Sequence, residues 1–231
     1  METDLPKNFF IRALAARHRV LLLGGMAVIA YGKARLTKDF DIWMEPFESP
    51  EEWTSRLVGV LADFPEAYFW SLAQQRIATA EEVSSDIADF GVIRIGGFEL
   101  PVDVFRRPNE LQPEDFEAVW SRAAKREDGV RLPAELDLIV TKMNTGRQHD
   151  DEDSGFLLSL VKRRFREQLS VCDLTEAKIL LARFTDPEVL SYALGNPNAD
   201  VRNYALELLR EFEAEGDPFS RDILAAWKEP T

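Results

Sequence analysis

The pattern of the chain changes at about residue 113, and this change limits the folds open to it. Before Pro113, short apolar segments with strand periodicity alternate with helical segments; the expected strands are 20–23, 39–44, 90–95 and 98–105. After Pro113 helical segments follow one another, with breaks near residues 170, 185–187, 196–198 and 216–218. We therefore predict an α+β protein. A mixed α/β domain with a small sheet, residues 1–125, would precede an all-α helical domain, residues 126–231.

Details of the front half refine this prediction. Ser49 and Pro50 mark a helix start, because a capping hydroxyl followed by proline at the first position is typical there. Gly96-Gly97 separates the last two expected strands and predicts a β-hairpin. Pro101 indicates that the second of these strands lies at a sheet edge or carries a local irregularity.

Composition excludes several classes of protein. The 231 residues include 28 Lys and Arg against 41 Asp and Glu, a net charge of −13, which disfavours non-specific DNA binding. The single cysteine, Cys172, excludes an internal disulfide framework, and two histidines disfavour a histidine metal site, so an oxygen-ligated metal stays open. No apolar run approaches ~20 residues and no signal peptide precedes the first helix, so we expect a cytoplasmic protein without membrane contact.

The segment DFDIWM places two acids on one strand face. Asp39 and Asp41 are two positions apart, so their side chains point to the same side while Phe40 points to the other. Two carboxylates this close repel each other unless a cation such as Mg²⁺ lies between them, although many such pairs simply face solvent. Asp103 stands between two valines of another expected strand. If the two strands are adjacent, three acids gather, enough to hold two metal ions.

Gly24-Gly25 lies between an expected strand and an expected helix. Glycines there let backbone N–H groups approach a phosphate, although an ordinary tight turn has the same pattern. Arg35 and Lys38 flank the Asp pair and could also contact phosphate, or could belong to a solvated turn.

A second cationic group lies in the back half. Lys142 and Arg147 are five positions apart on a helix expected from Pro133, about 140° apart around its axis. Both could reach a triphosphate, or both could face solvent. Asp150 and Asp153 lie one turn apart and are expected to support these cations rather than to bind metal. The nucleotide would then lie in a cleft between the two halves.

Together these residues resemble the minimal nucleotidyltransferases of the DNA polymerase β superfamily, and more narrowly the AbiEii-type toxins of abortive-infection and type IV toxin–antitoxin systems. The resemblance rests on Gly24-Gly25, on the segment 35–41 and on Asp103, and Lys142-x4-Arg147 with the acids that follow extends it to about residue 160. Two departures are visible. Many members have Gly-Ser where this chain has Gly24-Gly25, and relatives often have Lys-Asp in place of His149-Asp150.

The resemblance implies a metal-dependent nucleotidyltransferase that moves a nucleoside monophosphate from an NTP to a hydroxyl. Asp39, Asp41 and Asp103 would be catalytic and would bind Mg²⁺ or Mn²⁺. The nucleotide-binding residues would be Gly24, Gly25, Arg35, Lys38, Lys142 and Arg147. The acceptor could be a tRNA 3′ end, a protein side chain or a small molecule, and the protein could be a toxin with an antitoxin partner. Two alternatives stay open: a non-catalytic nucleotide-binding or antitoxin-like protein, and a helical interaction module that works through its back half.

Overall fold

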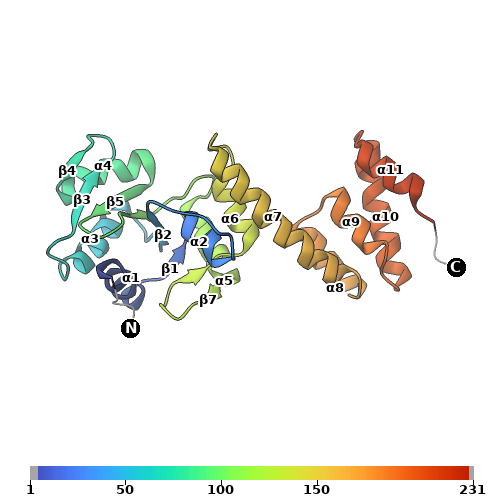
Figure 1. Ribbon diagram of the computed structural model, residues 1–231, viewed down its shortest axis with the longest axis horizontal. Coiled ribbons are helices and arrows are strands. Elements are labelled where there is room, and N and C mark those ends of the chain that lie inside the picture. The colour runs from blue at the N-terminus through green and yellow to red at the C-terminus, as the bar shows by residue number, and fades with distance from the viewer. Residues whose placement is uncertain (1–4, 229–231) are drawn as a thin grey trace. The chain divides into compact units, whose positions relative to one another are not determined.

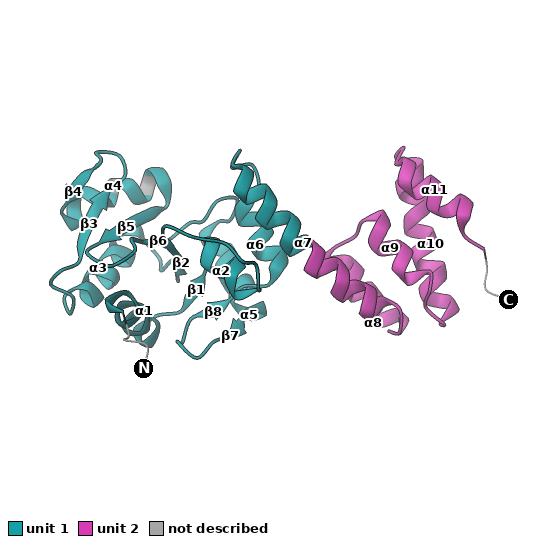
Figure 2. Ribbon diagram, viewed as in Figure 1, with its two compact units in different colours: residues 1–158 teal, residues 159–231 magenta. Residues whose placement is uncertain are grey.

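The computed structural model describes residues 5–228, apart from the side chains of Ser85 and Ala88. The chain divides into two compact units, Met1–Leu158 and Ser159–Thr231 (Figure 2). Unit 1 mixes strands and helices, and the described part of unit 2 contains helices only. This division falls later than the predicted boundary after residue 125. Residues 126–158 belong to unit 1, because strand β8 (Arg131–Leu132) pairs with β1 (Val20–Leu22) inside the same sheet.

Unit 1 is built on a mixed sheet of eight short strands, in the order β4-β3-β5-β6-β2-β1-β8-β7 (Figure 1 and Figure 2). The four predicted strands are confirmed as β1, β2 (Phe40–Met44), β5 (Val92–Gly96) and β6 (Val102–Phe105). The sheet is larger than predicted, because it also contains β3 (Tyr68–Ser71), β4 (Arg76–Ala78), β7 (Ala124–Lys125) and β8.

The register of the central strands places the acids. β2 and β6 are parallel, with Asp41 beside Asp103, and β5 runs antiparallel to β6, with Arg94 beside Asp103. β6 is therefore an interior strand, and the expectation of an edge position from Pro101 is wrong. Pro101 immediately precedes β6, where its carbonyl accepts a hydrogen bond of 2.9 Å from the Phe40 N–H. Its missing N–H therefore removes no donor from the ladder of β6.

The opposite face of these strands is apolar. One buried core contains residues of α1 (Pro6–Arg17) and α3 (Pro50–Leu61) together with the alternate residues Phe40, Ile42 and Met44 of β2 and Val102 and Val104 of β6. This alternation leaves the other face free to carry the acids. Trp43, two positions after Asp41, is buried as well. The other unit 1 helices are α2 (Gly24–Ala30), α4 (Ala80–Phe90), α5 (Phe116–Arg122) and α6 (Glu135–Lys142), with a 3₁₀ turn η1 (Pro113–Asp115) before α5.

Lys142 and Arg147 do not share a helix, which corrects the prediction. α6 ends at Lys142, and the long helix α7 begins at Gln148 and runs to Leu169, across the division between the units. The connection contains Asn144 (φ 58°) and Gly146 (φ 67°) in the left-handed region, a conformation that ends a right-handed helix. Arg147 therefore belongs to a loop, and the angle of about 140° expected on a helix does not apply.

Unit 2 confirms the predicted helix breaks. Its helices after α7 are α8 (Leu174–Arg183), α9 (Pro187–Ala193), α10 (Ala199–Ala214) and α11 (Pro218–Ala226). Each begins at a side-chain cap, provided by Asp173, Asp186, Asn198 and Asp217. None of the helices within residues 5–228 has both the length and the apolar character needed to cross a membrane.

Candidate functional site

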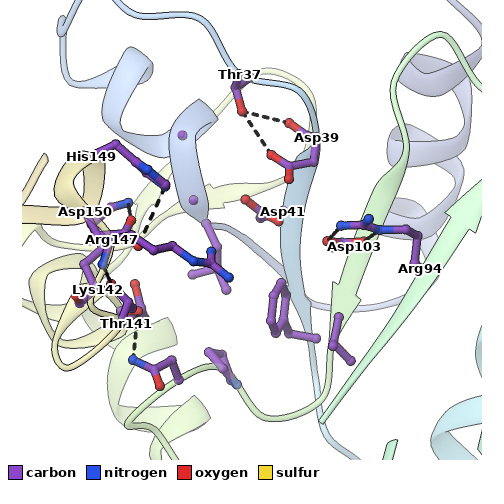
Figure 3. A pocket seen from close by; sticks show the side chains of 18 of the residues that line it. Thr37, Asp39, Asp41, Arg94, Asp103, Thr141, Lys142, Arg147, His149 and Asp150 are labelled. Atoms are coloured by element: carbon purple, nitrogen blue, oxygen red, sulfur yellow. Dashed lines mark hydrogen bonds and ion pairs between the residues drawn. The ribbon is translucent and has the colours of Figure 1, made fainter. Parts of the chain in front are cut away.

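Three carboxylates of unit 1 converge on one face of the sheet (Figure 3). One carboxylate oxygen from each of Asp39, Asp41 and Asp103 lies within 4.8 Å of the other two. The cause is the register, since Asp41 and Asp103 are neighbours on parallel strands and Asp39 precedes Asp41 by two positions. The predicted three-acid cluster is therefore present.

The cluster is electrostatically unfavourable without a cation. The pKa of Asp41 is raised to about 7, first by burial and then by the negative charges of Asp39 and Asp103. The positive charges of Lys142 and Arg94 oppose this rise. A divalent cation would relieve the repulsion, and a set of three carboxylates fits the hard oxygen ligands that Mg²⁺ and Mn²⁺ prefer.

Arg94 holds Asp103 in place, a role that the sequence analysis missed. Its Nε donates to Oδ1 at 2.7 Å and its Nη2 donates to Oδ2 at 2.6 Å, a two-point contact between neighbouring strands. Such fork contacts fix a carboxylate in both position and orientation. No signal in the sequence predicts this contact, because a two-residue turn at Gly96-Gly97 would place Arg94 opposite Glu99, whereas the longer connection between β5 and β6 places it opposite Asp103.

Both glycines are required by space, and Gly24 is required by backbone conformation as well. Gly24 has φ +56°, and a Cβ atom there would lie 1.7 Å from Oδ2 of Asp41. A Cβ atom on Gly25 would lie 2.8 Å from Oγ1 of Thr37. The glycine pair therefore packs directly against Asp41 and Thr37, which brings its backbone to the edge of the acidic cluster.

Lys142 is buried in a network of ion pairs on the other side of the cavity. Its Nζ lies 2.9 Å from Oδ1 of Asp150 and 2.9 Å from Oδ2 of Asp153. The side chain of Asp153 is only 1% exposed and also pairs with Lys33, at 2.9 Å, and with Arg35. Both acids thus contact the cation they were expected to support, and Asp153 in addition attaches the segment around Arg35 to α7.

These groups surround a cavity of about 550 Å³. Its lining includes the three acids, the glycine pair, Arg35, Lys142, Arg147 and Asp150. An apolar end, also missed from the sequence, completes it with Leu72, Phe90, Val92, Phe105 and Pro108. Of the predicted phosphate contacts, Lys38 is exposed and is not one of the described residues that line the cavity.

The cavity is a property of unit 1 alone. Its lining residues run from Leu23 to Asp150, all within Met1–Leu158. The predicted cleft between an α/β half and a helical half is thus replaced by a pocket between the sheet and the α6–α7 segment of the same unit. Arg147 is exposed in that segment and faces the same cavity as the acids.

Comparisons of the sequence with models of known protein families and with curated proteins find no match. Interpretation of the site therefore depends on its own chemistry: three adjacent acids, a glycine pair beside them, and cations across the cavity.

Proposed function

We propose that the protein is a metal-dependent nucleotidyltransferase, which moves a nucleoside monophosphate from an NTP to a hydroxyl and releases pyrophosphate. The observation that carries the proposal is the cluster of Asp39, Asp41 and Asp103, whose oxygens lie within 4.8 Å of one another in a cavity that Lys142 and Arg147 also line. A scaffold protein has no need to keep three repelling acids together. The non-catalytic alternative is therefore less well supported.

The acids would hold Mg²⁺ or Mn²⁺, which in such sites activates the attacking hydroxyl and stabilises the leaving oxygen. Asp39 and Asp41 lie beside the glycine pair and would face the triphosphate. Asp103 lies on the far strand, β6, and would face the acceptor. Arg94 would keep Asp103 oriented for this contact.

Charge and size both support an NTP as the substrate. An NTP carries about four negative charges, more than the metal ions can neutralise while the acids are ionised. Arg147 lines the cavity and is exposed, so it would supply positive charge to the nucleotide directly. Lys142 and Arg35 also line the cavity but are both paired with Asp153. The cavity of about 550 Å³ falls within the range of about 300–1,000 Å³ typical of small-molecule sites.

The acceptor stays open among a tRNA 3′ end, a protein side chain and a small molecule. The resemblance to the AbiEii-type toxins favours the first two acceptors and suggests a toxin with an antitoxin partner.

Transfer can be tested directly. The protein is incubated with each α-phosphate-labelled NTP, Mg²⁺ and cell extract, and label is sought on RNA, protein and small molecules. We expect the parent protein to label one of these three classes of acceptor, and the Asp39→Asn variant to label none. Asp103→Asn should keep the Kd for Mg²⁺–NTP within about tenfold, or ~1.4 kcal/mol, while transfer is lost. If the parent labels nothing beyond what Asp39→Asn labels, the proposal is wrong.

A further inference from the structure

The glycine at position 25 is explained by a neighbouring side chain. Its backbone does not adopt the left-handed conformation that Gly24 requires. Instead, a Cβ atom at position 25 would lie 2.8 Å from Oγ1 and 3.1 Å from Cβ of Thr37, and 3.3 Å from Cζ of Arg35. Thr37 therefore fills the space that a side chain at position 25 would need.

The Thr37 hydroxyl lies between the glycine pair and the acidic cluster. Its oxygen is 3.1 Å from Oδ1 of Asp39 and 3.2 Å from the Asp39 carbonyl oxygen (Figure 3). Thr37, Gly25 and Asp39 all line the cavity. The segment that carries Thr37 is attached to α7, because Arg35 pairs with the buried Asp153.

A threonine hydroxyl has one proton to donate. In this structure the proton is directed to Asp39, between its carboxylate oxygen Oδ1 and its carbonyl oxygen. A metal ion bound to the Asp39 carboxylate would engage the oxygen lone pairs that accept the Thr37 hydrogen bond. The carboxylate would then be a weaker acceptor. A phosphate group above Gly25 would offer charged oxygens as well, and these would be stronger acceptors than a carboxylate whose lone pairs are engaged by a metal ion.

We infer that Thr37 is a nucleotide-contacting residue, whose hydroxyl turns from Asp39 to a phosphate oxygen when Mg²⁺–NTP binds. This inference rests on the proposed function. The hydroxyl that contacts phosphate would then come from Thr37, in the segment before Asp39, and not from a serine beside Gly24.

Single substitutions give the first test. Thr37→Val keeps the shape of the side chain and removes the hydroxyl, so the Kd for Mg²⁺–NTP should rise about 10- to 100-fold, the range for a lost hydrogen bond to a charged group. Thr37→Ser keeps the hydroxyl and should stay within about threefold of the parent. The Kd for Mn²⁺ alone should not change in either variant. If Thr37→Val weakens Mn²⁺ alone as much as Mg²⁺–NTP, the hydroxyl only positions Asp39 and the inference is wrong.

A second test moves the hydroxyl from position 37 to position 25, across the contact between these two residues. In Gly25→Ser/Thr37→Ala, the serine Cβ takes the space vacated by the threonine hydroxyl, and its own hydroxyl lies one bond away. Gly25→Ala/Thr37→Ala makes the same steric contact without the hydroxyl and is the matched control. We expect the serine variant to bind Mg²⁺–NTP at least about fivefold more tightly than this control, provided that thermal unfolding shows both to be folded.

The outcomes separate this inference from the proposed function. A parent protein that binds none of the four NTPs with Mg²⁺ contradicts the proposed function itself. A parent that binds Mg²⁺–NTP, together with a Thr37→Val variant of equal affinity, contradicts only the role of Thr37.

Discussion

At the scale of single residues, the pKa of Asp41 links the acidic cluster to the stability of the protein. Burial and the charges of Asp39 and Asp103 raise it to about 7, from an ordinary value of 3.8. Between these two values the folded protein binds a proton that the unfolded chain does not. A group with a raised folded-state pKa contributes stability at low pH, and this contribution is lost as the pH rises through the folded value.

We therefore predict a pH-dependent difference between the parent and Asp41→Asn. The free energy of unfolding of the parent, relative to that of the variant, should fall by up to about 1.4 kcal/mol per pH unit between about pH 4 and pH 7. Urea unfolding at several pH values without divalent cations measures it. A relative stability that does not change over this range would contradict the burial and charge repulsion described for Asp41.

Gly24 offers a second test at the residue scale. Alanine at a left-handed position costs about 1–2 kcal/mol, and at position 24 its Cβ would also lie 1.7 Å from Oδ2 of Asp41. Gly146 is the matched control, because its φ of +67° is similar and no atom lies within 4 Å of the added Cβ. Urea unfolding should show a loss about 1–3 kcal/mol larger for Gly24→Ala than for Gly146→Ala, and only the former should lose metal binding. Equal losses would mean that Gly24 and Asp41 are not in contact.

At the scale of secondary structure elements, the sequence predicts the strands that carry the acids and misses their neighbours. The strands β2 and β6 alternate acidic and apolar residues, and this alternation is visible without a structure. β3 and β4 are four and three residues long, too short for a clear period, and their pairing depends on contacts distant in sequence. α4 did have a local signal, since Thr79 and Glu82 form a capping box at its start.

The helix break between Lys142 and Arg147 could not be predicted from periodicity, because asparagine and glycine, the residue types found at positions 144 and 146, also occur within helices. The break gives the two cations different environments. Lys142 is buried between Asp150 and Asp153, whereas Arg147 is exposed in the loop. Their contributions to binding and to stability should therefore differ.

Alanine at each position separates these contributions. Arg147→Ala should weaken Mg²⁺–NTP binding about 10- to 150-fold and change the free energy of unfolding by less than about 0.5 kcal/mol. Lys142→Ala should weaken binding less than Arg147→Ala does, because the charge of Lys142 is already paired with Asp150 and Asp153. It should also cost about 3 kcal/mol of stability, because Asp150 is left buried without its cation. Calorimetry and urea unfolding measure the two quantities. If both variants lose stability equally, or neither loses affinity, the assignment of the cations is wrong.

At the scale of the whole molecule, the acids and the glycine pair form one site because the sheet order brings β1, β2, β6 and β5 side by side. The ion pairs of Asp153 with Lys33 and Arg35 attach α7 to the same site. The boundary after residue 125 was misplaced because β7 and β8 have two residues each and show no periodicity. Only the pairing of β8 with β1 and of β7 with β8 reveals that this segment belongs to unit 1.

Unit 2 can therefore be perturbed without altering the cavity. Lys162 pairs with Asp186 at 3.2 Å and Glu188 at 2.5 Å, all within unit 2. Lys162→Ala should lower stability by about 1 kcal/mol, as for a partly exposed pair, and leave the Kd for Mg²⁺–NTP within about twofold. A loss of affinity as large as that of Arg147→Ala would show that nucleotide binding depends on unit 2.

The most direct test of the account is calorimetric titration of each NTP into the parent and into the Asp39→Asn/Asp41→Asn variant, with and without Mg²⁺. We predict that the parent binds at least one NTP, and binds it tightly only with the metal present. The variant should remain folded by thermal unfolding and lose this metal-dependent affinity. A parent that binds no NTP in the presence of Mg²⁺ or Mn²⁺, or a double variant that binds Mg²⁺–NTP as tightly as the parent, would contradict the claim that the three acids form a nucleotidyltransferase site.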